Sequence, residues 1–228
     1  MDKKNPEYKS VFISDVHLGT KSCKAKKLCE FLDSFESENL YLVGDIIDGW
    51  ALQKRHYWTK SQTEVIRKIL KISEKKNVYY IAGNHDEFIR PFFKYDFQIG
   101  TVVIADSFDY QSIDGRKILI THGDHFDRTM KIPRWFFIKV CKWIDYLPWV
   151  DTSESSFDQK MWDIFGTEST LRKHIKNKYD AALCGHTHQP IIKDDYMNTG
   201  DWVLNCTAIV EHLDGKWELI SKKSIDKS

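Results

Sequence analysis

Short apolar runs recur along the chain, and several of them end in Gly, Asp, Asn or His. The clearest is Tyr41 to Val43, which is followed by Gly44 and Asp45. A brief apolar run bounded by polar residues and glycine is typical of a buried central strand. We therefore expect the Asp45 carboxylate to lie at the carboxyl end of a strand, where open α/β sheets place their ligand sites. Taken alone, this Gly-Asp pair is equally typical of a cap on the next segment.

Two stretches with helical periodicity alternate with these runs. Residues 22 to about 38 carry apolar side chains at spacings of three and four, and so do residues 61 to about 76, where Ser61-x-x-Glu64 resembles a capping box. Residues 50–58 between them have the composition of a polar, aromatic loop. Strands are predicted at 10–14, 41–43, 78–81, 101–105, 108–113, 117–121, 181–184, 202–209 and 216–220.

The order of these elements predicts the class of the fold. Strand and helix alternate in the first part of the chain, and the middle turns more β-like. Asp114-Gly115 and Asp214-Gly215 each stand between two apolar runs, which is a hairpin signal. We expect an α/β (α+β) fold. The length of 228 residues fits a single domain over 1–228.

Composition narrows the classes of function. The net charge of +1 gives no electrostatic support for nucleic-acid binding. The five cysteines are scattered without a C-x-x-C pair, which suits a reducing compartment and argues against a zinc ribbon. Residues 1–6 lead into no apolar segment, and no run reaches the length of a membrane span. These features predict a cytoplasmic protein.

Residues 127–180 form a segment of different, largely helical character. Its first part, residues 132–150, is unusually rich in aromatic side chains. One interpretation is a core helix packed on the sheet. The other is a helical cap over the site that contacts lipid or membrane, because Arg134, Lys139 and Lys142 suit an interfacial helix beside anionic head groups.

Polar residues that can bind metal follow five of the predicted strands. They are Asp15, His17, Asp45, Asn84, His85, Asp86, His122, His186 and His188. Residues two apart share one side of an extended segment, as ligands of one ion must. Each residue alone is commoner in a structural role, but the set predicts a two-metal site with Asp45 as the shared bridge. Oxygen and nitrogen donors suit Mn, Fe, Zn, Ni or Co, and two ions about 3.5–4 Å apart serve the hydrolysis of phosphoesters and phosphoanhydrides.

These motifs also identify a family. Asp-x-His, Gly-Asp-x-x-Asp, Gly-Asn-His-Asp, His-Gly-Asp and Gly-His-Thr-His run in this order from residue 15 to 188, and the ordered set resembles the calcineurin-like metallophosphoesterases. The resemblance implies a four-layer sandwich in which two mixed β-sheets are flanked by helices. A relative that kept the fold without the chemistry is disfavoured, because the whole set of ligand residues is present.

The resemblance also implies a role for each site residue. Asp15, His17 and His188 would bind one ion, Asn84, His122 and His186 the other, and Asp45 both. The catalytic residues would be Asn84, His85 and Asp86, of which His85 acts on the leaving-group oxygen and Asp86 orients it.

Within that family, three stretches and the aromatic segment resemble the UDP-2,3-diacylglucosamine pyrophosphatase branch of lipid A biosynthesis. The stretches are residues 12–19, 44–50 and 198–203. The resemblance implies cleavage of a lipid-linked nucleotide to UMP and 2,3-diacylglucosamine 1-phosphate, with Mn as activator and peripheral contact with the inner membrane through the cap. The best-known members carry Arg where this chain has His85. The alternative is therefore a two-metal phosphodiesterase or phosphatase for another lipid or a small soluble nucleotide.

Substrate contacts are expected from a few further residues. Asn84 and His85 would contact substrate at the site itself, and Asp127 and Arg128 would meet the sugar and a phosphate, since Arg suits bidentate phosphate binding. The basic residues Arg172, Lys173, Lys176 and Lys178 suit either phosphate binding or a solvated helix face.

Overall fold

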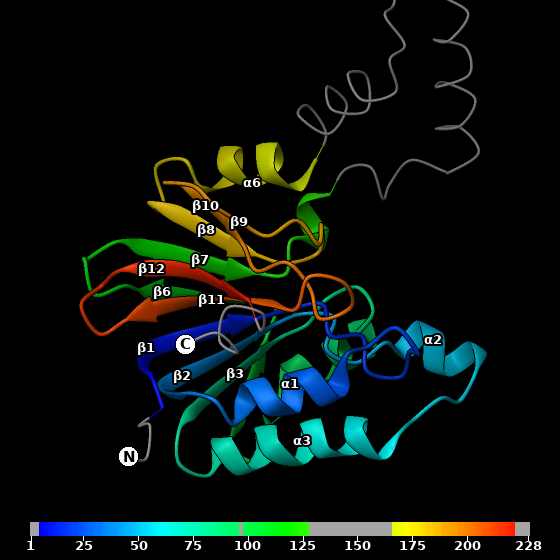
Figure 1. Ribbon diagram of the computed structural model, residues 1–228. Helices are drawn as coiled ribbons and strands as arrows, with labels where there is room; N and C mark the ends of the chain where they lie inside the picture. Colours follow the sequence, from blue (N-terminus) through cyan, green and yellow to red (C-terminus); the bar gives the residue numbers. More distant parts are fainter. Residues whose placement is uncertain (1–4, 96–97, 128–165, 222–228) are drawn as a thin grey trace, which may run out of the picture.

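Two β-sheets pack face to face and carry helices on their outer faces (Figure 1). The computed structural model describes residues 5–95, 98–127 and 166–221. The helices are α1 (Ala25–Leu32), α2 (Gly49–Lys54), α3 (Lys60–Ser73) and α6 (Thr167–Ile175), with 3₁₀ turns η1 (Glu87–Tyr95) and η2 (Asp124–Phe126). Helices α1 and α3 cover one sheet and α6 covers the other, so the predicted four-layer sandwich is confirmed.

Both sheets are mixed. The first has the order β12 (Trp217–Ser221), β11 (Thr207–His212), β1 (Glu7–Ile13), β2 (Glu36–Val43), β3 (Asn77–Ile81), β5 (Val102–Ala105), β4 (Gln98–Ile99). The second has the order β6 (Ser107–Gln111), β7 (Lys117–Thr121), β8 (Ala181–Cys184), β10 (Tyr196–Asn198), β9 (Ile191–Ile192). Strands β1, β2, β3 and β5 are parallel, as are β7, β8 and β10, while the outer pairs are antiparallel. The carboxyl ends of the parallel strands in each sheet therefore meet at one edge.

Alternation along β1 shows how the sequence builds two cores. Val11 and Ile13 pack toward α1 and α3, whereas Phe12 points into the layer between the sheets, as the period of two requires. In that layer the rings of Phe12 and Tyr41 stack at 4.9 Å, and Tyr41 stacks on Tyr79 at 4.6 Å. All three lie on neighbouring strands, so the stack fixes how the parallel strands face the second sheet.

The described structure corrects two helix predictions. The first helix ends at Leu32 rather than near residue 38, because residues 36–39 pair with β1 in the parallel ladder and so extend β2. The second begins after Thr59, whose side chain and that of Gln62 form the capping box, so the expected box at Ser61 is wrong.

Two further expectations are corrected around Asp48 and Asp201. Residues 49–54 form helix α2, not a loop, because the Asp48 carboxylate caps the amide of Ala51 at 2.7 Å. The strand predicted from residue 202 begins at Thr207. The Asp201 carboxylate accepts hydrogen bonds from the amides of residues 203–205, and these residues therefore form a turn. Both hairpins at Asp-Gly are confirmed.

The segment predicted to form a helical cap lies mostly outside the described residues. Residues 128–165, which include the aromatic segment 132–150, are not among them, so the cap stays a prediction; near the end of the segment, residues 167–175 form α6. Among the helices that are described, none has both the length and the apolar character needed to cross a bilayer.

A buried polar chain joins the two sheets. The Tyr110 hydroxyl of β6 lies 2.7 Å from Ser10 Oγ of β1 and donates to the Glu211 carboxylate of β11, which also accepts the Ile113 amide at 2.8 Å. Burial raises the pKa of Glu211. The Tyr110 hydroxyl of the five-stranded sheet therefore supplies a hydrogen bond to the buried Glu211 carboxylate of the seven-stranded sheet.

Replacing Tyr110 by Phe is expected to lower the free energy of unfolding by about 1–3 kcal/mol, because it leaves buried oxygen atoms without a partner. Urea unfolding followed by tryptophan fluorescence measures the change. Tyr79→Phe is the matched control, because the Tyr79 hydroxyl makes no hydrogen bond to any of the described residues. An equal loss in both variants would show that the polar chain contributes nothing of its own.

Candidate functional site

The candidate site lies where the carboxyl ends of strands from both sheets meet. Asp15 and His17 follow β1, Asp45 follows β2, and Asn84 and His85 follow β3; His122 follows β7, and His186 and His188 follow β8. All eight are brought together, as predicted. The parallel arrangement explains this, because each strand delivers its terminal loop to the same edge.

Five of these residues have a left-handed backbone. They are Asp15 (φ 53°), His17 (φ 52°), Asp45 (φ 53°), His186 (φ 68°) and His188 (φ 58°). Residues with a Cβ rarely adopt this region, and such strain gathers at functional sites when the surroundings enforce it. Here the amide of Asp15 donates to Gly44 O at 3.0 Å and that of His17 to Asp45 O at 2.9 Å. The loops after β1 and β2 thus hold each other in place.

Glycines leave room for the carboxylates. A Cβ placed on Gly83 would lie 2.1 Å from Asp45 Oδ1, and one on Gly185 would lie 2.4 Å from Asp15 Oδ2. Both are far inside van der Waals contact. The two carboxylates therefore occupy the space that any larger residue at 83 or 185 would fill.

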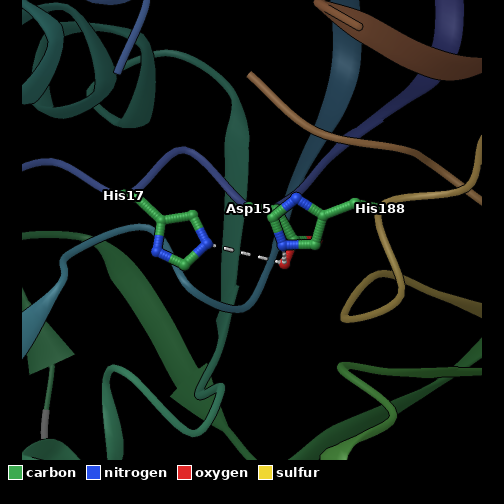
Figure 2. Close-up of side chains that lie close together, drawn as sticks. All are labelled: Asp15, His17 and His188. Atoms are coloured by element: carbon green, nitrogen blue, oxygen red, sulfur yellow. Dashed lines mark ion pairs between the residues drawn. The ribbon is translucent and has the colours of Figure 1, made fainter. Parts of the chain in front are cut away.

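Asp15 is flanked by two imidazoles (Figure 2). Its Oδ1 lies 3.1 Å from His188 Nε2 and 3.9 Å from His17 Nε2. Burial raises the pKa of Asp15, but the nearby imidazoles of His188 and His122 outweigh it, so the net shift is downward. The carboxylate is held ionised between two nitrogen donors.

Asp45 occupies the middle of the cluster. Its Oδ2 lies 3.4 Å from His122 Nε2, 3.8 Å from His17 Nε2 and 3.9 Å from His85 Nε2. Burial raises its pKa, but these imidazoles together lower it below the usual range. The position suits a carboxylate shared between two ligand sets.

His122 is held by its other nitrogen. Its Nδ1 lies 2.9 Å from Val43 O, so that Nδ1–H donates to this carbonyl oxygen. The other ring nitrogen, Nε2, then faces Asp45. Burial lowers the pKa of His122, but the Asp45 and Asp15 carboxylates raise it to about 10. The electrostatics of this spot therefore favour a positive charge.

Asn84 and His186 form the other side of the site. Asn84 Oδ1 lies 3.1 Å from His186 Nδ1, and His186 Nε2 lies 2.9 Å from Asp127 Oδ2. Asp127 is buried behind the ring. Its expected contact with a sugar stays a prediction, and the contact observed here is with His186. Arg128 lies outside the described residues.

Asp48 is a functional residue that the sequence interpretation missed. Its carboxylate faces two imidazoles, with His85 Nδ1 at 3.0 Å and His17 Nδ1 at 3.1 Å. Asp86 instead accepts the amides of Ile46 and Ile47 at 3.1 and 2.8 Å. The interpretation that Asp86 orients His85 is therefore wrong; it holds the loop after β2. The last Asp of Gly-Asp-x-x-Asp was the available signal for Asp48.

Buried polar atoms that lack hydrogen-bond partners show whether metal ions fit the site. Among the described residues, Asp15 Oδ1, His17 Nε2 and His122 Nε2 are buried and make no hydrogen bond. Buried polar atoms are nearly always satisfied. Asp15, His17 and His188 hold ligand atoms within 4.8 Å of one another, and so do Asp15, Asp45 and His122. The donor set is oxygen and nitrogen, which fits divalent ions of the Mn to Zn series.

A cavity of about 1100 Å³ adjoins the site. It reaches from His186 and His188 to α6, and its lining includes Asp127, Arg172 and Lys193. Its volume is that of a pocket for a drug-sized or larger ligand. Of the basic residues expected to bind phosphate, Arg172 lines this cavity, whereas Lys173, Lys176 and Lys178 are exposed elsewhere on the surface.

Known proteins resemble this chain over most of its length. The UDP-2,3-diacylglucosamine hydrolase of Blochmanniella pennsylvanica is 27% identical over 208 residues, which cover 82% of this chain and 81% of that protein. The UDP-2,3-diacylglucosamine hydrolase of Shewanella sp. strain ANA-3 is 23% identical over an alignment 240 residues long, which covers 91% of this chain and 95% of that protein. Among solved structures, Yfce, a phosphoesterase from E. coli, is 13% identical, with 93% of this chain and 98% of that chain covered at a TM-score of 0.49.

The family model described as calcineurin-like phosphoesterase matches residues 8–190. That range contains every one of the eight site residues and both sheets' central strands. The chain belongs to the calcineurin-like phosphoesterase family.

Proposed function

We propose that this phosphoesterase hydrolyses the phosphoanhydride of a lipid-linked nucleotide, UDP-2,3-diacylglucosamine, to UMP and 2,3-diacylglucosamine 1-phosphate. The observation that carries the reaction class is the cluster around Asp45, whose neighbours present buried ligand atoms without partners. The relatives named above, which cover more than four fifths of the chain, support the substrate.

Two divalent ions fit the site, and we propose Mn rather than Zn, Fe, Ni or Co. Asp15, His17 and His188 would hold one, Asn84, His122 and His186 the other, and Asp45 both. When bound, such ions polarise phosphoryl oxygens and offset the charge that develops in the displacement.

We propose that His85 moves a proton in the reaction. Its Nδ1 lies 3.0 Å from Asp48 Oδ1, and its Nε2 lies 3.9 Å from Asp45 Oδ2. The Trp50 ring covers it at 4.3 Å, with the indole N–H fixed on Glu87 at 3.0 Å. A half-buried imidazole oriented in this way can protonate the leaving-group oxygen.

The cavity lining favours a second candidate function, hydrolysis of a small soluble phosphodiester or nucleotide. Thr167, Ser169, Gln189 and Asn205 are polar groups suited to sugar and phosphate. Sheltering of acyl chains by residues 132–150, and membrane contact through them, stay proposals because these residues lie outside those described.

Phosphorus NMR of purified, Mn-loaded protein mixed with UDP-2,3-diacylglucosamine in detergent is expected to show UMP and the lipid monophosphate. Asp15→Ala serves as the blank, because it removes a carboxylate that faces two imidazoles. Hydrolysis of bis-p-nitrophenyl phosphate without turnover of the lipid would contradict the lipid substrate and leave the reaction class standing.

Asp45→Asn is expected to reduce both Mn stoichiometry and activity, the latter by at least about 100-fold, because it neutralises the carboxylate at the centre of the cluster. Metal content after dialysis and steady-state rates measure the two effects. The matched control is Asp109→Asn, an exposed carboxylate on β6 paired with Lys117. Full metal content in Asp45→Asn would remove this residue from the metal site.

Asp127→Asn is expected to weaken Mn affinity by roughly 10–100-fold, because a carboxylate on the far nitrogen of a ligand histidine orients the ring and raises its basicity. Calorimetric titration of the apoprotein with Mn measures the affinity. If Asp127 instead contacts the sugar, KM rises while Mn affinity stays at the wild-type value.

A further inference from the structure

Two segments near the site, each part helix and part loop, carry a concentrated positive charge. Residues 18–29 and 49–61 contain Lys21, Lys24, Lys26, Lys27, Lys54, Arg55 and Lys60, and they contain neither Asp nor Glu. The whole chain has a net charge of only +1. The rest of the chain is therefore net negative, and the cations of these two segments form a polarised patch.

The two segments lie side by side in the fold. Gly19 packs closely against α2, because a Cβ placed at Gly19 would lie 2.7 Å from Leu52 Cγ. The Gln62 side chain at the start of α3 also donates to Thr20 O at 2.9 Å. A cavity of about 490 Å³ between them is lined by Lys21, Lys24, Lys26, Lys27, Tyr57 and Lys60, among others. In Figure 1, α2 and the first turn of α3 lie at the same end of the molecule. We define the docking surface as Tyr57 and Trp58 together with the seven cationic residues of the two segments, which are Lys21, Lys24, Lys26, Lys27, Lys54, Arg55 and Lys60.

The cations of the docking surface are exposed and lack ion pairs within the described residues. Three lysines elsewhere form close ion pairs instead: Lys9 with Glu38, Lys68 with Asp33 and Lys193 with Glu168, each within 2.6 Å. Gathering like charges without neutralisation disfavours the isolated protein and favours an anionic partner.

Aromatic side chains indicate the kind of partner. Trp58 is 43% exposed within the docking surface, and Trp50, 36% exposed, stands on the same helix-and-loop segment. Lysine and arginine clusters attract anionic lipid head groups, and Trp and Tyr are enriched at the level of those head groups. Stacking on nucleic-acid bases would use the same rings, but the proposed lipid-linked substrate favours lipid. Helix α2 starts directly after Asp48, and its Trp50 ring covers His85, so the docking surface continues to the rim of the site.

We propose that the docking surface binds the face of an anionic bilayer. The bilayer would then lie against the edge of the sheets where the site opens. The choice of lipid rests on the proposed function, and the proposal goes beyond that function by naming the surface and the partner that it binds.

Co-sedimentation of the full chain with vesicles tests the proposal without any substrate, so its failure and that of the proposed reaction are separate results. Wild-type protein is expected to bind phosphatidylcholine vesicles that contain phosphatidylglycerol more tightly than vesicles of phosphatidylcholine alone. Lys21→Gln/Lys24→Gln is expected to weaken this binding about 25-fold at low salt, since each cation near such a surface contributes about five-fold. High salt is expected to shrink the difference.

Lys71→Gln/Lys75→Gln is the matched control, because it removes the same charge from exposed positions at the other end of α3. Unchanged hydrolysis of bis-p-nitrophenyl phosphate shows that both variants are folded. Equal weakening in the two variants, or no preference of the wild type for phosphatidylglycerol, overturns the proposal. It is also overturned if Lys21→Gln/Lys24→Gln loses affinity for a short single-stranded RNA while vesicle binding is unchanged.

Discussion

Two carboxylates buried in one place are the constraint on which the site depends. Asp15 and Asp45 are 0% and 2% exposed, and buried like charges are tolerated only when cations or strong hydrogen-bond donors surround them. The imidazoles of His17, His122 and His188 lie within ion-pair distance of the two carboxylates. Yet three buried ligand atoms are left without a partner in the described part of the chain. The protein thus holds an arrangement that is complete only with further positive charge.

The arrangement requires strained backbone conformations. Left-handed conformations at five site residues turn their side chains toward one point, and hydrogen bonds between the loops after β1 and β2 keep them there. Gly83 and Gly185 add the missing space. Because parallel strands supply the loops, a rigid sheet edge holds residues that are distant in sequence at fixed separations, which is what a reaction between positioned groups requires.

The sequence predicts the parts of this structure that depend on local pattern. Asp45 follows an apolar run and a glycine, and the two Asp-Gly hairpins join strands of clear alternation, so all three were found from sequence. The first half of β2 was not, because residues 36–39 are polar and become strand only by pairing with β1. The partner of His85 was misassigned for a similar reason: Asp86 is its neighbour in sequence, whereas Asp48 reaches it through the fold. Left-handed Asp and His residues give no sequence signal beyond the glycines around them.

The site also spans the boundary between the two layers. Asp15, His17, Asp45 and Asn84 extend from the seven-stranded sheet, whereas His122, His186 and His188 extend from the five-stranded one. Ions held by both sets would cross-link the sheets, so that metal binding and folding would be thermodynamically coupled. At a free ion concentration about a hundredfold above its Kd, each such ion would add about 2.7 kcal/mol to the stability of the native state. The same residues that form the candidate site would then also join the two sheets, and chelation would weaken the contact between them.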